Sequence, residues 1–340
     1  MEQIKFALIG CGRAGMIHAR NYASTVPGTC VFAVADANAE AAQKAAAELG
    51  ASVWSTDYRQ ILARPEIQAV VIAAPTSLHH DIVIDAAQAG KHIFCEKPMA
   101  MNAQECREMI DAAEKHHVKL QIGFMRRFDA GFRRAKEFVD SGAIGDVVMV
   151  KSHTRGPSTP REWMYDIRKS NGPLAEVNSH DIDTLRWFTG SEAQKVYAVA
   201  GNHRCPQAKE NWPDFYDTVL LSVTMENQMI GCIEGAQGVG YGYDARVDVL
   251  GTKGCIQIGG LQDKAVLLYT KESGMQGDIV ASWTNLFHEA YIQEDMSFAQ
   301  AVRENSPTLV TGLDGLMAVR IVCAGNRSIT SGQIVSMAEV

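Results

Sequence analysis

A lysine that follows an apolar run is the first residue of this chain whose position suits proton chemistry. Lys97 stands in the segment Cys95-Glu96-Lys97-Pro98, and the residues before it, His92–Glu96, have the pattern of a buried strand. An ammonium at the end of such a strand can donate a hydrogen bond to a reacting hydroxyl and stabilise negative charge on its oxygen. The alternative is a solvated surface lysine, which is the usual place for this residue type.

A histidine and a carboxylate in the second half of the chain form another candidate pair. Glu176 and His180 are four residues apart, so they share one face if the segment is helical. A carboxylate beside an imidazole fixes its tautomer and stabilises the imidazolium, which makes the histidine a general base near neutral pH. A histidine with a purely structural hydrogen bond is the alternative. We expect His180 to be the base and Glu176 its partner.

A glycine-rich turn near the N-terminus indicates a nucleotide site. Gly10-Cys11-Gly12-Arg13-Ala14-Gly15 matches G-x-G-x-x-G, follows the apolar strand Lys5–Ile9 and opens a helix, which is the context that the motif requires. Such a turn lets the backbone approach a pyrophosphate, and the helix N-terminus offers it N–H groups and partial positive charge.

An acidic residue after the second predicted strand favours NAD over NADP. Asp36 lies 21 residues past Gly15, and a carboxylate there accepts hydrogen bonds from the adenosine ribose and repels a 2′-phosphate. By the switch-point rule, the ends of the following strands also face the ligand. The full set of expected cofactor contacts is Gly10, Cys11, Gly12, Arg13, Ala14, Gly15, Met16, Asp36, Ala74, Pro75, Thr76, His79, Glu96, Lys97 and Arg126.

These residues need a parallel sheet to position them, and the first 123 residues predict one. Short apolar runs alternate there with helical patterns, as in a doubly wound α/β domain. The predicted strands are Lys5–Ile9, Val31–Asp36, Ala69–Ala74, His92–Glu96 and Lys119–Gly123. The predicted helices are Ala14–Thr25, Ala39–Leu49, Leu78–Ala89 and Ala103–His116. The last has Asn102 and Glu105 in capping-box positions.

After Gly123 the pattern changes to strands joined by short polar links. The predicted strands are Val147–Val150, Val196–Gly201, Thr218–Met225, Met229–Glu234, Arg246–Leu250, Cys255–Ile258 and Ala265–Tyr269, and the predicted helices are Ala130–Ser141, Ile182–Phe188, Ala290–Asn305 and Gly315–Ser331. We therefore expect a doubly wound Rossmann domain over residues 1–123. An α+β domain with a large, mainly antiparallel open sheet should follow over residues 124–340. Because such a sheet needs cover on its exposed face, we expect a homo-oligomer, a dimer or a tetramer.

Composition and charge exclude several classes of protein. The formal charge of −7 argues against nucleic-acid binding, and we find no apolar run long enough to span a membrane. The eight cysteines form no C-x-x-C pair and have no zinc-finger spacing, so neither a metal site nor a disulfide framework is expected. Since no signal-peptide pattern opens the sequence, we expect a cytoplasmic protein.

Several motifs together resemble the glucose–fructose oxidoreductase and inositol dehydrogenase family over nearly the whole chain. They are Ile9–Gly15 with His18, the triplet Glu96-Lys97-Pro98, and Gly123–Asp129, which narrows the resemblance toward inositol 2-dehydrogenases. The segment Gly172–Asp183 is similar to the catalytic segment of that group. It departs from the group at Glu176, where aspartate is usual, and at Asn171, where glycine is usual.

The resemblance implies an NAD-dependent dehydrogenase that oxidises a secondary hydroxyl of a cyclic polyol, of myo- or scyllo-inositol type, to a ketone. His180 would be the base, and Lys97 would bind the reacting oxygen. The expected substrate contacts are Lys97, Arg127, His153, Arg155, Trp163, Glu176, His180 and Tyr241.

Three alternatives stay open at this stage. The departure at Glu176 and the aromatic residues of Trp163-Met164-Tyr165 suit oxidation of a sugar or glycoside to a keto-sugar. An enzyme that keeps its cofactor bound and cycles it between substrates is a second. The third, from another class, is a non-catalytic NAD sensor, which would not need Lys97 or His180.

Overall fold

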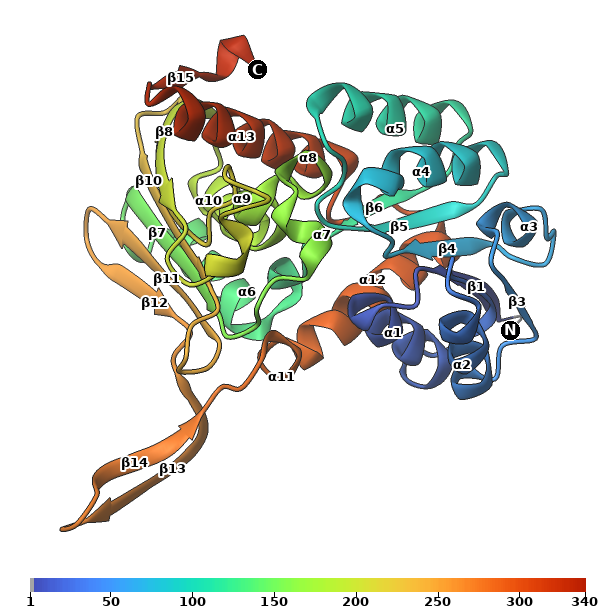
Figure 1. Cartoon of the computed structure of the whole chain (residues 1–340), viewed down its shortest axis with the longest axis horizontal. Coiled ribbons are helices and arrows are strands. Elements are labelled where there is room, and N and C mark those ends of the chain that lie inside the picture. The colour runs from blue at the N-terminus through green and yellow to red at the C-terminus, as the bar shows by residue number, and fades with distance from the viewer. Residues whose placement is uncertain (1–2) are drawn as a thin grey trace. The chain divides into compact units, whose positions relative to one another are not determined.

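The computed structural model describes residues 3–340, and these form two compact units (Figure 1). The first unit contains the chain up to Phe128 together with Glu289–Val319. The second contains Asp129–His288 and Arg320–Val340. The predicted division placed a single boundary at residue 123. The first unit differs from it because it also includes Glu289–Val319.

The first unit is built on a six-stranded parallel sheet with the order β3-β2-β1-β4-β5-β6. Its strands are β1 Ile4–Ile9, β2 Thr29–Ala35, β3 Val53–Ser55, β4 Ala69–Ile72, β5 His92–Glu96 and β6 Leu120–Gly123. Its early helices are α1 Arg13–Arg20, α2 Ala39–Leu49, α3 Tyr58–Leu62, α4 His79–Gln88 and α5 Ala103–Lys115. The strand order changes direction at β1 and β4, which is the switch point of a doubly wound fold. The predicted fold class is confirmed.

Local hydrogen bonds explain why most predicted boundaries in this unit hold. The backbone N–H of Glu105 donates to Asn102 Oδ1 over 2.9 Å, so Asn102 caps α5 as expected, and Glu105 Oε2 accepts the N–H of Met101, one residue before the cap, over 2.9 Å. Two elements were missed. Strand β3 has only three residues, and the five-residue helix α3 is too short to show a period.

The segment Glu289–Val319 belongs to the first unit because its helix α12 (His288–Glu304) completes that unit's core. Phe298 is fully buried, and its ring meets the rings of Phe6 and Phe94 edge-on at centroid distances of 6.2 and 5.7 Å. The sequence predicted this helix correctly, but a helical period does not reveal which sheet its apolar side covers.

The second unit is built on a seven-stranded sheet with the order β12-β11-β7-β10-β9-β8-β15. Its strands are β7 Val147–Gly156, β8 Ala193–Gly201, β9 Thr218–Met225, β10 Ile230–Gln237, β11 Asp244–Gly251, β12 Cys255–Ile258 and β15 Val335–Ser336. All neighbours are antiparallel except β7 and β10, which run parallel, so the predicted mainly antiparallel sheet is confirmed. Strand β7 extends six residues beyond its predicted end at Val150.

Helices cover one face of this sheet. The helices of this unit are α6 Ala130–Asp140, α7 Glu162–Tyr165, α8 Ile167–Ser170, α9 Gly172–Glu176, α10 Ser179–Thr189, α11 Trp283–Leu286 and the second half of α13 Gly312–Ser331, and α9 and α10 lie against the central strands of the sheet. A Cβ atom added at Gly231 would lie 2.4 Å from the Leu185 side chain of α10. Glycine at this point of β10 therefore allows α10 to lie directly on the sheet.

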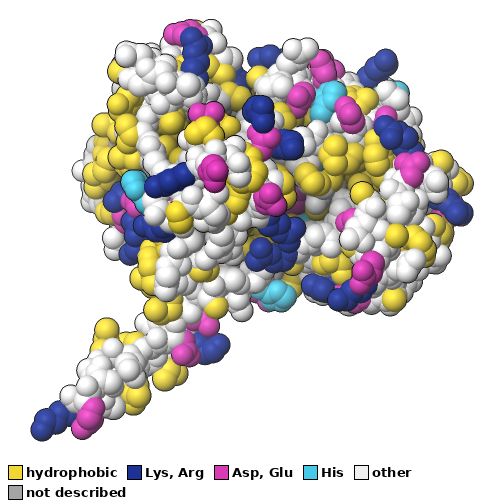
Figure 2. Space-filling model, viewed as in Figure 1, with side chains coloured by type: hydrophobic (Ala, Val, Ile, Leu, Met, Phe, Trp, Pro, Cys, Tyr) yellow, Lys and Arg dark blue, Asp and Glu magenta, His cyan; other side chains and the backbone are white. Residues whose placement is uncertain are grey.

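The opposite face, here called the outer face, carries exposed apolar side chains. Tyr197, Val199, Leu220, Ile230 and Leu250 on strands β8 to β11 are all between 40 and 54% exposed. Figure 2 shows apolar side chains gathered over this side of the unit. A hairpin of β13 (Gln262–Thr270) and β14 (Gly274–Ile279) projects from the same unit, and nearly all of its residues are exposed (Figure 1). Strand β14 was not predicted, because its sequence does not alternate.

Candidate active site

The glycine turn between β1 and α1 has the geometry of a pyrophosphate cradle. Gly10 has φ of +98°, and a Cβ atom there would lie 2.6 Å from the carbonyl carbon of Ala73, the residue directly after the neighbouring strand β4. A Cβ at Gly15 would lie 2.2 Å from the Gly10 oxygen, whereas a Cβ at Gly12 would meet nothing within 4 Å. The first and third glycines are therefore needed for packing, and the second keeps open space at the N-terminus of α1.

Asp36 follows β2 and is held beside this turn by two backbone donors. The N–H of Cys11 donates to Asp36 Oδ2 over 2.8 Å, and the N–H of Asn38 donates to Asp36 Oδ1 over 2.9 Å. Each carboxylate oxygen keeps a further lone pair that can accept from a ribose hydroxyl. The open cradle and the oriented carboxylate fit the adenosine half of NAD.

The thiol in the glycine turn is not a nucleophile. Burial, and then the charge of Asp36, raise the pKa of Cys11 to about 12. The thiol therefore stays protonated at neutral pH, and Cys11 contributes its backbone rather than sulfur chemistry to the turn.

The loops after β4 and β5 are joined by His79, one of the expected cofactor contacts. Its ring nitrogens lie 2.8 Å from the Ala74 oxygen and 2.9 Å from the Pro98 oxygen, and the side chain is 1% exposed. Burial lowers the pKa of this imidazole. His79 thus holds two loops at the carboxyl edge of the sheet together, and Thr76 beside it is also buried.

Lys97 follows β5 at the same edge of the sheet. Its backbone N–H donates to the Oε2 atom of Glu96 over 3.0 Å. Glu96 was expected to contact the cofactor, but it is 5% exposed and its other oxygen is bonded to His18. Both carboxylate oxygens of Glu96 are therefore bonded within the protein.

The two arginines after β6 differ in their surroundings. Arg126 is 1% exposed and is the largest fully buried side chain of the described chain. Arg127 Nη2 donates to Asp314 Oδ1 over 2.8 Å, and Asp314 Oδ2 accepts from the Thr311 backbone N–H over 2.9 Å. Arg127, expected as a substrate contact, is thereby bonded to the first turn of α13.

Glu176 and His180 do not share one continuous helix. The condition under which their spacing would place them on one helix face is therefore not met. Helix α9 ends at Glu176, and α10 begins at Ser179. Between them, Asn178 has φ of −89° and ψ of 0°, and its Nδ2 atom donates to the Glu234 oxygen of β10 over 3.2 Å. This bond to the sheet explains the break. Both residues stay candidates, and His180 is 7% exposed.

A buried carboxylate that the sequence analysis missed fixes the start of α10. Asp181 is fully buried and accepts hydrogen bonds from Ser152 Oγ (2.5 Å), Thr154 Oγ1 (3.1 Å) and Asn178 Nδ2 (2.8 Å). These bonds tie the turn that carries His180 to β7. The available signal was an aspartate in the first turn of a helix, directly after the candidate base.

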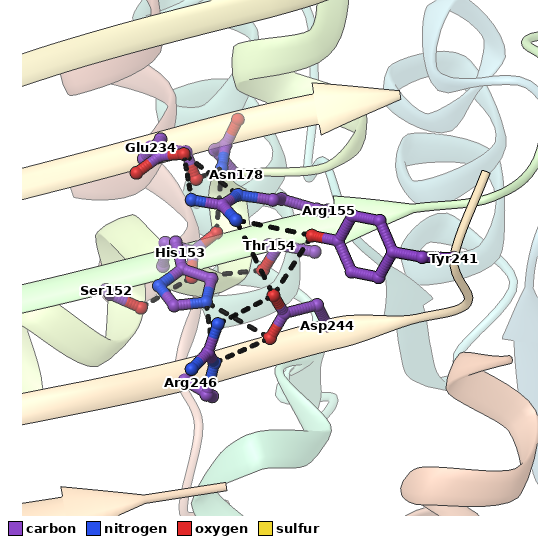
Figure 3. Close-up of polar contacts among 10 residues, drawn as sticks. Ser152, His153, Thr154, Arg155, Asn178, Glu234, Tyr241, Asp244 and Arg246 are labelled. Carbon is purple, nitrogen blue, oxygen red and sulfur yellow. Dashed lines mark hydrogen bonds and ion pairs between the residues drawn. The ribbon is translucent and has the colours of Figure 1, made fainter. Parts of the chain in front are cut away.

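Three expected substrate contacts lie on the outer face of the sheet. Successive residues of a strand point to opposite faces, and Ser152 and Thr154 of β7 point to α10, so His153 and Arg155 point away from it (Figure 3). Tyr241 accepts from Arg155 Nη1 over 3.3 Å. The sheet therefore separates His153 and Arg155 from α10, and Tyr241, in the connection between β10 and β11, is bonded to the same side. His153 and Arg155 lie within β7 and not after it, because the strand extends six residues beyond its predicted end.

The outer-face residues form a paired network instead. Asp244 of β11 is fully buried and accepts from Arg246 Nε (2.7 Å) and Nη2 (2.9 Å), and His153 Nε2 lies 3.1 Å from it. Burial raises the pKa of Asp244, but the bonds from Arg246 and His153 outweigh that effect and lower it overall. Arg155 also pairs with Glu234 (Figure 3). These charges neutralise one another on the surface of the sheet.

The remaining expected contact, Trp163, lies in the four-residue helix α7 and is half-buried. The neighbouring Tyr165 packs in a small core with Cys205, Ala208 and Phe215. Within residues 3–340, no group of three or more His, Cys, Asp or Glu side chains is arranged so that it could hold a metal ion. Over the same residues, none of the helices combines the length and the apolar character needed to cross a membrane.

An open glycine cradle, an oriented aspartate after β2 and a lysine at the carboxyl edge of a parallel sheet define a dinucleotide-binding protein of the oxidoreductase class. The comparisons with known proteins agree. Residues 4–124 match the model described as "Oxidoreductase family, NAD-binding Rossmann fold", and residues 132–257 match the GFO/IDH/MocA C-terminal domain. The chain belongs to the GFO/IDH/MocA oxidoreductase family, as its motifs predicted.

Its relatives include named inositol dehydrogenases. The chain is 34% identical to scyllo-inositol 2-dehydrogenase (NAD(+)) of Bacillus subtilis over 99% of this chain and 97% of that protein. It is 30% identical to myo-inositol 2-dehydrogenase of Thermotoga maritima, with 99% of each covered. Its fold matches the crystal structure of scyllo-inositol dehydrogenase from Lactobacillus casei with bound NAD(H) and scyllo-inositol (TM-score 0.91, 28% identity, 99% of this chain and 100% of that one).

Proposed function

We propose that this protein is an NAD-dependent dehydrogenase that oxidises a secondary hydroxyl of a cyclic polyol, of myo- or scyllo-inositol type, to a ketone. The single observation that carries the proposal is the cradle of Gly10, Gly12 and Gly15 with Asp36 beside it, in a chain that also keeps Lys97 and His180. The names of the relatives support the substrate class.

The cofactor fits the residues of the first unit. The N-terminus of α1 would take the pyrophosphate, and Asp36 would take the adenosine ribose. The bound nicotinamide supplies a hydride acceptor. The buried apolar sheet and the loops held by His79 give the cofactor a fixed support, so little ordering is needed at the moment of reaction.

The two candidate side chains would divide the proton chemistry between them. His180 takes the hydroxyl proton, and the Lys97 ammonium donates a hydrogen bond to the same oxygen and stabilises its developing negative charge. The bonds of Asp181 to β7 support this role for His180, because they fix the helical turn on which the imidazole stands. Glu176 is proposed as a substrate contact or as a partner of His180.

A substrate panel tests the proposal. Purified protein is given NAD with myo-inositol, scyllo-inositol, glucose or an aryl glucoside, and NADH formation is followed by absorbance. We expect turnover with at least one inositol. Turnover with glucosides alone would favour the keto-sugar alternative, which Trp163 and Glu176 support. Binding of NAD without turnover of any polyol or sugar would favour a sensor.

The outer face supports a homo-oligomer, dimeric or tetrameric. Its exposed apolar side chains, among them Tyr197, Leu220 and Ile230, would lose water on pairing with a second copy, and the network around Asp244 presents no unbalanced charge there. Sedimentation velocity measures the subunit number directly. The eight cysteines are all free thiols, which supports a reducing, cytoplasmic location.

A further inference from the structure

Four buried polar side chains of the first unit form a connected network behind Lys97. His18 of α1 lies 2.8 Å from Glu96 Oε1 through Nε2 and 2.7 Å from Asp295 Oδ1 through Nδ1. Asn21 Nδ2 donates to Asp295 Oδ2 over 2.8 Å. His18 and Asp295 are fully buried, and Glu96 and Asn21 are each 5% exposed. None of these four residues takes part in the proton transfer proposed for His180 and Lys97.

The network carries a buried positive charge between two negative ones. An ionised carboxylate only accepts hydrogen bonds, so both ring nitrogens of His18 must carry a proton to bond Glu96 and Asp295 together. Burial by itself lowers the pKa of His18, but the two carboxylates raise it well above its usual value. Burial likewise raises the pKa of Glu96, whereas the bond from His18 and the nearby charges lower it overall. His18 is therefore an imidazolium.

The carboxylate of Glu96 is held from several sides. Oε1 is bonded to His18, and Oε2 accepts the backbone N–H of Lys97. A Cβ atom added at Gly123 would lie 3.2 Å from Glu96 Cδ, so the adjoining strand β6 leaves just enough space for this side chain. The ring of Phe94 lies 4.6 Å from the His18 ring and helps to keep water from the pair. Glu96 has little freedom to turn away from Lys97.

We propose that His18, Asp295 and Glu96 are positioning residues that fix the backbone of Lys97 and thereby direct its ammonium to the substrate oxygen. His18 lies on the same helix α1 whose N-terminus forms the pyrophosphate cradle, so the network also connects that helix to the lysine. This inference rests on the proposed role of Lys97.

Glu96→Gln separates charge from shape. The amide oxygen of the glutamine can still accept the Lys97 N–H, and its NH₂ can donate to a neutral His18, which then donates to Asp295. The hydrogen bonds are kept, but they no longer join a charged imidazolium to two carboxylates and are therefore weaker. We expect kcat to fall about tenfold. The Kd for NAD should stay within about twofold, and the melting temperature should fall, because the buried Asp295 carboxylate loses the cation that balances it.

A double-mutant cycle distinguishes positioning of Lys97 from a general structural role. The cycle compares the full-length wild type, Glu96→Gln, Lys97→Met and the double variant with NAD and inositol. If Glu96 acts through Lys97, adding Glu96→Gln to Lys97→Met should change the residual kcat by no more than about twofold. Glu105→Gln is the matched control, because Glu105 also accepts a backbone N–H, from Met101, and should leave kcat unchanged.

The outcomes separate this inference from the function on which it rests. The positioning role alone is overturned if Glu96→Gln lowers kcat by the same factor in the wild type and in Lys97→Met. It is also overturned if Glu96→Gln leaves the kcat of the wild type unchanged. Full turnover by Lys97→Met overturns the proposed role of the lysine, and this inference with it. If Glu96→Gln does not fold, Asp295→Asn takes its place in the cycle. Asp295 reaches Glu96 only through His18, so Asp295→Asn should lower kcat by a smaller factor, about threefold, and only when Lys97 is present.

Discussion

Asp36→Asn is the substitution whose effect on cofactor binding follows most directly from the geometry. Each oxygen of Asp36 accepts one backbone N–H, over 2.8 and 2.9 Å, and keeps a lone pair for the ribose. In asparagine one oxygen becomes an NH₂ group, which cannot accept from either Cys11 or Asn38. The variant therefore loses a charge-assisted hydrogen bond to the ribose. Its NH₂ group also faces a backbone N–H, of Cys11 or Asn38, and two donors cannot bond each other.

A hydrogen bond to a charged group contributes about 1.5–3 kcal/mol. Losing one should raise the Kd for NAD by about 10- to 150-fold. Isothermal titration calorimetry with NAD and with NADP measures this, and the preference for NAD should narrow because the repulsion of a 2′-phosphate is gone. Asp129→Asn is the control, since Asp129 accepts backbone N–H groups at the start of α6 in the second unit. An unchanged Kd in a folded Asp36→Asn protein would refute the assignment of Asp36 to the ribose.

Three further outcomes are expected. Lys97→Ala and His180→Ala should each lower kcat by about 10²- to 10⁴-fold in steady-state assays while leaving the Kd for NAD nearly intact, and near-normal turnover of both would remove them from the mechanism. Gly12→Ala should fold normally and bind NAD poorly, since its Cβ meets only open space, whereas Gly15→Ala should lose about 1–3 kcal/mol of stability in urea unfolding; the reverse pattern would contradict the cradle geometry. Because the pKa of Cys11 is raised to about 12, its alkylation, followed by peptide mass spectrometry, should stay slow through pH 9 and rise only near pH 12; rapid labelling at pH 8 would contradict this.

Those parts of the fold that depend on local signals could be predicted from the sequence. The helix of residues Ala39–Leu49 has its predicted bounds, because Asn38 caps it and Gly50 ends it in the left-handed region. The glycine turn and Asp36 could be predicted for the same reason, since turn, strand and acid lie within one βαβ segment.

Features that depend on distant packing could not be predicted. The place of α12 in the first unit depends on Phe298 meeting Phe6, which lies nearly the whole chain away. The orientation of His153 depends on the length of β7, because its side-chain direction follows from the hydrogen bonds of its neighbours to Asp181. The break between α9 and α10 likewise depends on Asn178 reaching the sheet. No local pattern records these contacts.

Transfer of deuterium tests the central claim most directly. The wild-type protein is given NAD and an inositol that carries deuterium on its ring carbons, and the reduced cofactor is isolated and analysed by mass spectrometry. Hydride transfer predicts one deuterium in each NADH and a slower turnover than with the unlabelled ring. NADH without the label, or no NADH from any inositol, would contradict the proposed reaction.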